Sequence, residues 1–154
     1  MKKLIKTIVP LYNAALCNVH MTTSYLSLGS NLRSPERQLR QAFARIRSLP
    51  RTAVLNISPL YFNPAVGRRS QPRYCNCAIK ITTSLPPLTL LRHCLTIEKK
   101  QQRTRKVHWG ARTLDIDILL YGNQTIHHKD LTIPHPRMRE REFVLLPLSK
   151  IFTP

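Results

Sequence analysis

Two aspartates inside an aliphatic run are the residues best suited to chemistry in this chain. Asp115 and Asp117 alternate with aliphatic residues at the period of a β-strand, so both point to one face, about 7 Å apart along the strand. Like charges this close are costly on a buried strand unless a cation compensates them. Mg²⁺ held by one or two carboxylates and by substrate phosphates is a common arrangement. The alternative is a solvated strand edge with two incidental acids, although the chain has only seven acidic residues and places two here.

The same alternation predicts the two faces of this strand. The face opposite to the aspartates is expected to be purely aliphatic and to hold Leu114, Ile116, Ile118 and Leu120. The face of the aspartates is expected to continue with Leu119 and Tyr121.

A basic segment leads directly into the aspartate strand. From Lys99 to Arg112 the chain carries six Lys or Arg residues. The planar fork of arginine matches phosphate oxygens, so several arginines beside carboxylate-bound Mg²⁺ suit a polyphosphate. A solvated loop or a nucleic-acid patch would also use these charges, but carboxylates repel a phosphate backbone unless a metal ion lies between them. With Mg²⁺ the same residues make a phosphoryl-transfer site.

A second polar pair lies on the predicted strand Tyr74–Thr83. Tyr74 and Asn76 share one face, while Cys75 and Cys77 share the other. A flat aromatic ligand could stack there and bond to Asn76, whose amide offers both a donor and an acceptor. Such a pair is usually an ordinary surface feature, so its value depends on the aspartates being on the same sheet.

The remaining patterns predict the elements that position these residues. Four strands are expected at Tyr25–Leu28, Thr52–Tyr61, Tyr74–Thr83 and Leu114–Tyr121, with helices after Ser34-Pro35 and after Pro86-Pro87. The order βαββαβ is typical of a ferredoxin-like α+β sandwich, an antiparallel four-stranded sheet with both helices on one face. The polar side chains would then gather on the other face.

Composition sets the class of the protein. The 154 residues suit one domain, and 42% apolar content argues against disorder. The net charge of +18 implies an anionic partner, without distinguishing a nucleic acid, an acidic membrane and a nucleoside triphosphate. No CxxC spacing joins the four cysteines, which favours buried reduced thiols over disulfides. They are Cys17, Cys75, Cys77 and Cys94.

The first twenty residues are expected to lie outside the fold. They loosely resemble a signal peptide, but Lys6 and Pro10 interrupt the apolar run. We therefore expect an extension at 1–20 and a domain at 21–154. No apolar run in the sequence is long enough to span a membrane.

Several longer motifs occur in a fixed order along the chain. They are Leu28-Gly29-Ser30-Asn31-Leu32, Pro72-Arg73-Tyr74-Cys75-Asn76, Glu98, Arg103-Thr104-Arg105, the block from Trp109 to Asp117, Pro134-His135-Pro136-Arg137-Met138 and Arg141-Glu142-Phe143-Val144-Leu145. Together they closely resemble the 6-hydroxymethyl-7,8-dihydropterin pyrophosphokinase family of folate biosynthesis. The resemblance runs from about Tyr25 to Leu148.

The resemblance implies a Mg-dependent diphosphotransferase. It would transfer pyrophosphate from ATP to the hydroxymethyl oxygen of the pterin, giving AMP and the pterin diphosphate. It also implies a C-terminal hairpin and short helix, two Mg²⁺ ions and ATP as co-substrate. We expect a cytoplasmic monomer that binds neither nucleic acid nor a membrane.

The resemblance also assigns roles to individual positions. The implied catalytic residues are Arg103, Arg105, Asp115 and Asp117, of which the two aspartates hold the metal ions. The implied pterin-binding residues are Asn63, Pro64, Val66, Tyr74, Asn76 and Phe143. The implied ATP-binding residues are Glu98, Arg103, Arg105, Trp109, Arg112, Ile118, Thr132, His135 and Arg141.

The chain departs from the family pattern at a few positions. His108 stands where Arg is usual, Gln102 where Gly is usual, Ala111 where Pro is common and Asn63 where Thr is usual. The chain also ends at Pro154, short of the usual C-terminal tail. Two other hypotheses stay open: a basic module that binds RNA on its sheet, and a degenerate relative that binds its ligands without turnover.

Overall fold

The computed structural model describes residues 20–65, 71–102 and 111–153. Its elements are β1 (Thr22–Ser30), α2 (Pro35–Arg47), β2 (Thr52–Ile57), β3 (Tyr61–Asn63), β4 (Tyr74–Thr83), α3 (Pro87–Lys100), β5 (Asp115–Tyr121), β6 (Ile126–His128), β7 (Leu131–Ile133), the 3₁₀ helix η1 (Met138–Glu140) and α4 (Glu142–Ser149).

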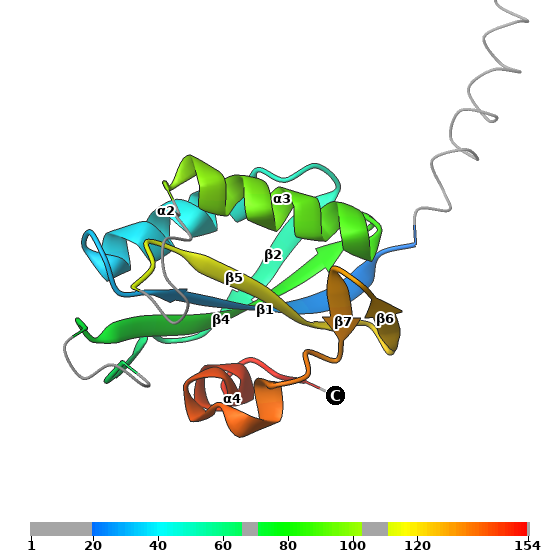
Figure 1. Ribbon diagram of the computed structural model, residues 1–154. Helices are drawn as coiled ribbons and strands as arrows, with labels where there is room; N and C mark the ends of the chain where they lie inside the picture. The colour runs from blue at the N-terminus through cyan, green and yellow to red at the C-terminus, as the bar shows by residue number, and fades with distance from the viewer. Residues whose placement is uncertain (1–19, 66–70, 103–110, 154) are drawn as a thin grey trace, which may run out of the picture.

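The main sheet is antiparallel with the order β2-β4-β1-β5, and β3 also pairs with β4. Helices α2 and α3 cover one face, and α4 lies on the other (Figure 1). The hairpin β6–β7 makes a separate two-stranded sheet. When β2 and β3 are taken as one broken strand, this is the predicted ferredoxin-like fold with a C-terminal hairpin and short helix.

The break between β2 and β3 corrects the single predicted strand Thr52–Tyr61. Pro59 has no backbone N–H to donate to β4. Beside it, Ser58 donates its N–H to the Ala78 carbonyl, and the Ser58 hydroxyl accepts from Ala78 N, both at 2.9 Å. This side-chain hydrogen bond replaces one backbone pair of the β-ladder. Pairing resumes at β3, which lies opposite the first residues of β4.

The helix-facing core follows from the sequence pattern. Leu39, Ala42 and Ile46 are the buried stripe of α2, and Leu90, Cys94 and Ile97 belong to that of α3. The cysteines 75, 77 and 94 are free and buried, which confirms the prediction of reduced thiols for the part of the chain that the structure describes. Burial raises the pKa of Cys75 to about 11 and that of Cys94 to about 12.

The end of β5 corrects the predicted alternation. Tyr25 pairs with Leu120, whereas Leu26 pairs with Ile118, so β5 carries one extra residue at this point. Such a β-bulge reverses the faces of the residues that follow it. Leu120 packs on the α4 side, and Tyr121 lies in the helix-facing core, where its hydroxyl donates to the Leu85 carbonyl at 2.7 Å.

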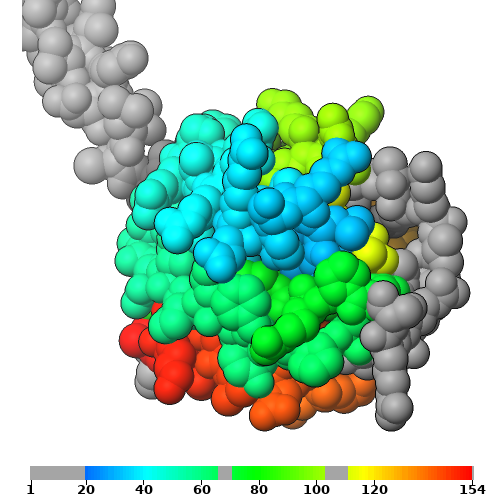
Figure 2. Space-filling model, turned by 90° about the vertical axis from the view of Figure 1, so that its left-hand side faces the viewer, coloured from blue at the N-terminus to red at the C-terminus, as the bar shows by residue number. Residues whose placement is uncertain are grey.

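The second face of the sheet is only partly open. Val144 and Leu148 of α4 pack there against Tyr25, Ala78 and Leu119. Figure 2 shows this layering from the side, with α2 and the end of α3 above and the orange and red C-terminal segment below. No helix among the described residues has the length and apolar content needed to cross a membrane.

Candidate active site

One row of paired residues crosses the part of the sheet that α4 leaves uncovered. Tyr61 of β3 pairs with Asn76 of β4, Asn76 pairs with Gly29 of β1, and Gly29 pairs with Asp115 of β5. Neighbouring strands lie about 4.8 Å apart, so Asn76 and Asp115 are separated by about 10 Å. Asp117 follows in the next row, opposite Ser27. The prediction that the Asn76 face and the aspartate face coincide is therefore confirmed.

Gly29 keeps the middle of this row flat. A Cβ at Gly29 would stand 2.7 Å from Asn76 Oδ1, closer than side-chain atoms pack. Gly29 was expected just after the predicted strand Tyr25–Leu28, as part of a motif, but it lies inside β1. A glycine within a strand pattern marks the close approach of another group, and that signal could have identified its role.

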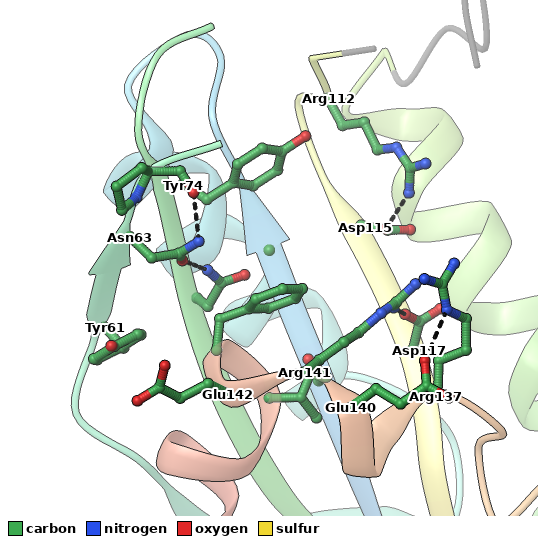
Figure 3. Close-up of a pocket in the computed structure, with 16 residues that line it drawn as sticks. Tyr61, Asn63, Tyr74, Arg112, Asp115, Asp117, Arg137, Glu140, Arg141 and Glu142 are labelled. Carbon is green, nitrogen blue, oxygen red and sulfur yellow. Dashed lines mark hydrogen bonds and ion pairs between the residues drawn. The ribbon is translucent and has the colours of Figure 1, made fainter. Parts of the chain in front are cut away.

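A cavity of about 510 Å³ lies over this row. Five of the six predicted pterin-binding residues line it: Asn63, Pro64, Tyr74, Asn76 and Phe143. Val66 lies outside the described residues. The cavity wall also contains residues to which the sequence analysis gave no role, among them Tyr61, Glu140 and Glu142, which lie on the left and lower side of the site in Figure 3.

The amide of Asn76 is fixed by its neighbours. Asn76 is 3% exposed, and its Nδ2 donates to Asn63 Oδ1 at 2.5 Å. Asn63 Nδ2 in turn donates to the Pro64 carbonyl at 2.8 Å. Asn63 stands opposite Tyr74 in the β3–β4 ladder, diagonal to Asn76, which is why the two amides meet.

A second cavity, of about 680 Å³, lies between α3 and the hairpin β6–β7. Of the predicted ATP-binding residues, Glu98, Arg112, His135 and Arg141 line it. The hairpin adds His128, Lys129 and Asp130, which sequence reasoning missed; a polar run between two short strands was the only signal. Arg103, Arg105 and Trp109 lie outside the described residues.

Two predicted ATP-binding residues do not line either cavity with their side chains. Ile118 is buried in the helix-facing core, and Thr132 lies on β7. Ile116 N donates outward from β5 to Glu98 Oε1 at 2.8 Å. Because the direction of backbone groups repeats every second residue, the N–H and C=O of Ile118 also face the free edge of β5.

The two cavities share one wall, made of Arg112, Asp115, Asp117 and Arg141. Arg112 Nη1 forms an ion pair with Asp115 Oδ2, and Arg141 Nη1 lies 3.7 Å from Asp117 Oδ2. Figure 3 shows both arginines turned toward the aspartates. His135 Nε2 approaches the same Asp117 oxygen, at 3.8 Å. The shared wall thus brings two carboxylates together with compensating cationic groups.

The donor set of the shared wall fits a hard divalent cation. The side chains of Asp115 and Asp117 are 22% and 33% exposed, so their oxygens remain within reach of molecules in either cavity. Among the described residues, no group of three or more His, Cys, Asp or Glu side chains is arranged to hold a metal ion. A cation here would therefore take its remaining ligands from water and from bound substrates, as Mg²⁺ commonly does.

Asn31 holds the backbone of Arg112, one of the residues of the shared wall. The Asn31 side chain is buried, with 1% of the residue exposed, and its Oδ1 accepts a hydrogen bond from the Arg112 backbone N–H at 2.7 Å. The backbone N–H of Asn31 donates to the Arg112 carbonyl at 3.0 Å. Asn31 Nδ2 lies 3.2 Å from both the Pro72 carbonyl and Gln71 Oε1. One buried amide therefore joins the end of β1 to the residues that precede β4 and β5.

Comparison with known proteins agrees with this geometry. A family model described as 7,8-dihydro-6-hydroxymethylpterin-pyrophosphokinase matches residues 25–153. The chain is 47% identical over 131 residues to a 2-amino-4-hydroxy-6-hydroxymethyldihydropteridine pyrophosphokinase of Haemophilus influenzae, which covers 85% of this chain and 82% of that protein. It is 44% identical over 128 residues to the protein of the same name from Bacillus subtilis, covering 83% and 77%.

A solved structure has the same fold. It is a triple mutant of Plasmodium falciparum HPPK-DHPS with STZ-DHP, which matches with a TM-score of 0.65 and 15% identity. The match covers 86% of this chain and 40% of that one, and it concerns the fold alone. The family model and the two relatives decide the assignment: this chain belongs to the 7,8-dihydro-6-hydroxymethylpterin-pyrophosphokinase family, diphosphotransferases of folate biosynthesis.

Proposed function

We propose that this chain transfers pyrophosphate from ATP to 6-hydroxymethyl-7,8-dihydropterin in an Mg²⁺-dependent reaction at the shared wall of its two cavities. The products are AMP and the pterin diphosphate. The observation that carries the proposal is that Asp115 and Asp117 belong to both cavities at once. Two substrates bound in separate cavities can react only where the cavities meet.

The first cavity suits the pterin. Its floor is flat at Gly29, and Asn76 provides an amide for the polar edge of a ring. The separation of about 10 Å between Asn76 and Asp115 spans two strand spacings, enough for a bicyclic ring whose hydroxymethyl group points toward the aspartates. Phe143 supplies an aromatic surface at the same cavity.

The second cavity suits ATP. Leu88, Leu91 and Leu95 of α3 provide an apolar side for the base, while Arg112 and Arg141 lie at the end nearest the aspartates. These arginines would hold the phosphates in line with the pterin hydroxyl. We assign Ile118 a contact through its backbone at the edge of β5, and we keep Thr132, Trp109, Arg103 and Arg105 as predicted nucleotide or phosphate ligands.

The site acts mainly by positioning its two substrates and neutralising the phosphate charge. Phosphoryl-type transfer requires positioning and neutralisation more than covalent catalysis. Two Mg²⁺ ions on Asp115 and Asp117 would neutralise phosphate charge and activate the attacking hydroxyl. Arg112, Arg141 and His135 already lie within ion-pair range of these carboxylates, so they are placed to keep the aspartates aligned and to contact the phosphates. A cytoplasmic, monomeric enzyme remains part of this proposal.

The test is AMP formation by the purified full chain. We expect AMP only when ATP, the pterin and Mg²⁺ are all present, and we expect EDTA to abolish it. Binding of both substrates without AMP would instead indicate a degenerate relative. Binding of single-stranded RNA, with no affinity for the pterin, would favour the nucleic-acid hypothesis and contradict the proposal.

A further inference from the structure

We propose that the Asn63 side chain determines ligand selectivity in the first cavity by fixing the orientation of the Asn76 amide. This inference rests on the proposed function, since the ligand that it concerns is the pterin. It adds a specificity-determining residue whose effect acts through another side chain.

The orientation of both amides is set by the Pro64 carbonyl, because a backbone carbonyl can only accept a hydrogen bond. Asn63 must therefore turn its Nδ2 toward this carbonyl oxygen, and the two atoms lie 2.8 Å apart. The Asn63 Oδ1 then faces Asn76. A carbonyl oxygen in that place requires a donor, so Asn76 must present its Nδ2, at 2.5 Å.

The consequence appears at the other end of the Asn76 amide. Its Oδ1 is turned toward Gly29, where an added Cβ would stand 2.7 Å from it. The cavity floor therefore presents an acceptor in the middle of the row that leads to Asp115. A ligand that places an N–H at this point is favoured, and one that places a carbonyl or a bare ring nitrogen there meets repulsion between two acceptors.

A threonine at position 63 would not impose this polarity. Its hydroxyl can rotate to donate or to accept, so it is compatible with either orientation of the Asn76 amide. An asparagine anchored on a backbone carbonyl is compatible with only one. The Asn63 amide therefore fixes the orientation of the Asn76 amide before the ligand binds. This lowers the entropy cost of ordering the Asn76 side chain on binding.

Three variants of Asn63 separate orientation from simple packing. Asn63→Ala removes the acceptor that faces Asn76, and we expect it to weaken pterin binding about five-fold or more. Asn63→Asp loses the bond to the Pro64 carbonyl, and its second oxygen must turn away from that carbonyl, but it keeps an oxygen that can only accept toward Asn76. It should therefore bind the pterin at least three-fold more tightly than Asn63→Ala. Asn63→Thr should fall between them. Asn56→Ala is the matched control. Asn56 lies on β2, and among the contacts described its side chain only accepts a hydrogen bond from Ile57 N.

The readouts are the pterin Kd from titration calorimetry, the KM and kcat of AMP formation, and the melting temperature. We expect the KM for the pterin to change with little change in kcat or in ATP binding. Equal pterin affinity in wild type and Asn63→Ala would overturn the inference, and so would equal losses in the Ala and Asp variants. A parallel loss of ATP affinity and melting temperature would show a structural role and would also overturn it. If the wild type binds no pterin, the proposed function itself fails.

Discussion

The carboxylates of β5 lie beside different basic side chains. Asp115 pairs with Arg112, a neighbour in sequence, whereas Asp117 lies near His135 and Arg141, which follow the hairpin. The shared face of the two aspartates could be predicted from alternation alone. Their partners at 135 and 141 could not be predicted from periodicity, because that contact depends on how the hairpin folds back onto β5. There, His135 N donates to the Leu119 carbonyl at 2.9 Å.

Gly29 provides a test at the level of a single residue. Gly29→Ala places a Cβ against Asn76 Oδ1, and the amide must move out of its position. We expect the KM for the pterin to rise about ten-fold, as for the loss of one buried pairing, while the Kd for ATP stays within about two-fold. Steady-state kinetics and calorimetry measure the two quantities.

Gly122→Ala is the matched control for Gly29→Ala. Gly122 has a φ of +51°, and its Cβ would stand 2.9 Å from Thr22 Cγ2, so this change should reduce stability by about 1 kcal/mol. It lines neither cavity. A rise in the KM for the pterin that is as large in Gly122→Ala as in Gly29→Ala would show that instability, and not the cavity floor, is responsible.

At the level of elements, α3 supports the free edge of β5. Glu98 is 3% exposed and accepts the Ile116 N–H at 2.8 Å, so a helix side chain continues the hydrogen bonding of the sheet. The strands and helices could be predicted from their periods, but this link could not. The bulge before Leu120 was missed for a related reason, because it becomes evident only when the partner strand is known. The break at Pro59 had a signal in the sequence, since a proline within a strand pattern removes a donor from the ladder.

Glu98 gives the test at this scale. Glu98→Ala leaves the Ile116 N–H buried without its acceptor, which should lower the free energy of unfolding by about 1–3 kcal/mol. Glu98→Gln retains an acceptor oxygen and should lose less than half as much. Urea unfolding of both variants measures the difference. Equal losses would mean that the charge of Glu98, rather than its hydrogen bond, stabilises β5.

At the scale of the whole molecule, burial keeps the described cysteine thiols protonated and unreactive. Cys75 and Cys77 face the helix layer, and Cys94 faces them from α3, within one core. Burial raises the pKa of all three thiols, so at pH 8 almost none of each is present as the reactive thiolate. The absence of metal-type spacing, together with the shared strand face of Cys75 and Cys77, predicted this state from the sequence.

Thiol labelling tests the packing of the whole fold. In a Cys17→Ser variant, which removes the cysteine outside the described residues, we expect iodoacetamide at pH 8 to label fewer than one thiol per chain in an hour. After unfolding in guanidinium, all three should react. Mass spectrometry counts the adducts. Rapid labelling of the folded variant would show that the helix layer does not seal the core as described.

The central claim is that Asp117 acts at the junction of two cavities and not in the binding of one ligand. The decisive measurement is the single-turnover rate of AMP formation by Asp117→Ala at saturating Mg²⁺, together with the Kd for the pterin alone. We expect the rate to fall on the order of 10²-fold or more, because the change removes transition-state stabilisation, while the pterin Kd changes less than about three-fold. A variant that keeps half of the wild-type rate, or one that loses its affinity for the pterin to the same extent as its rate, would contradict the account.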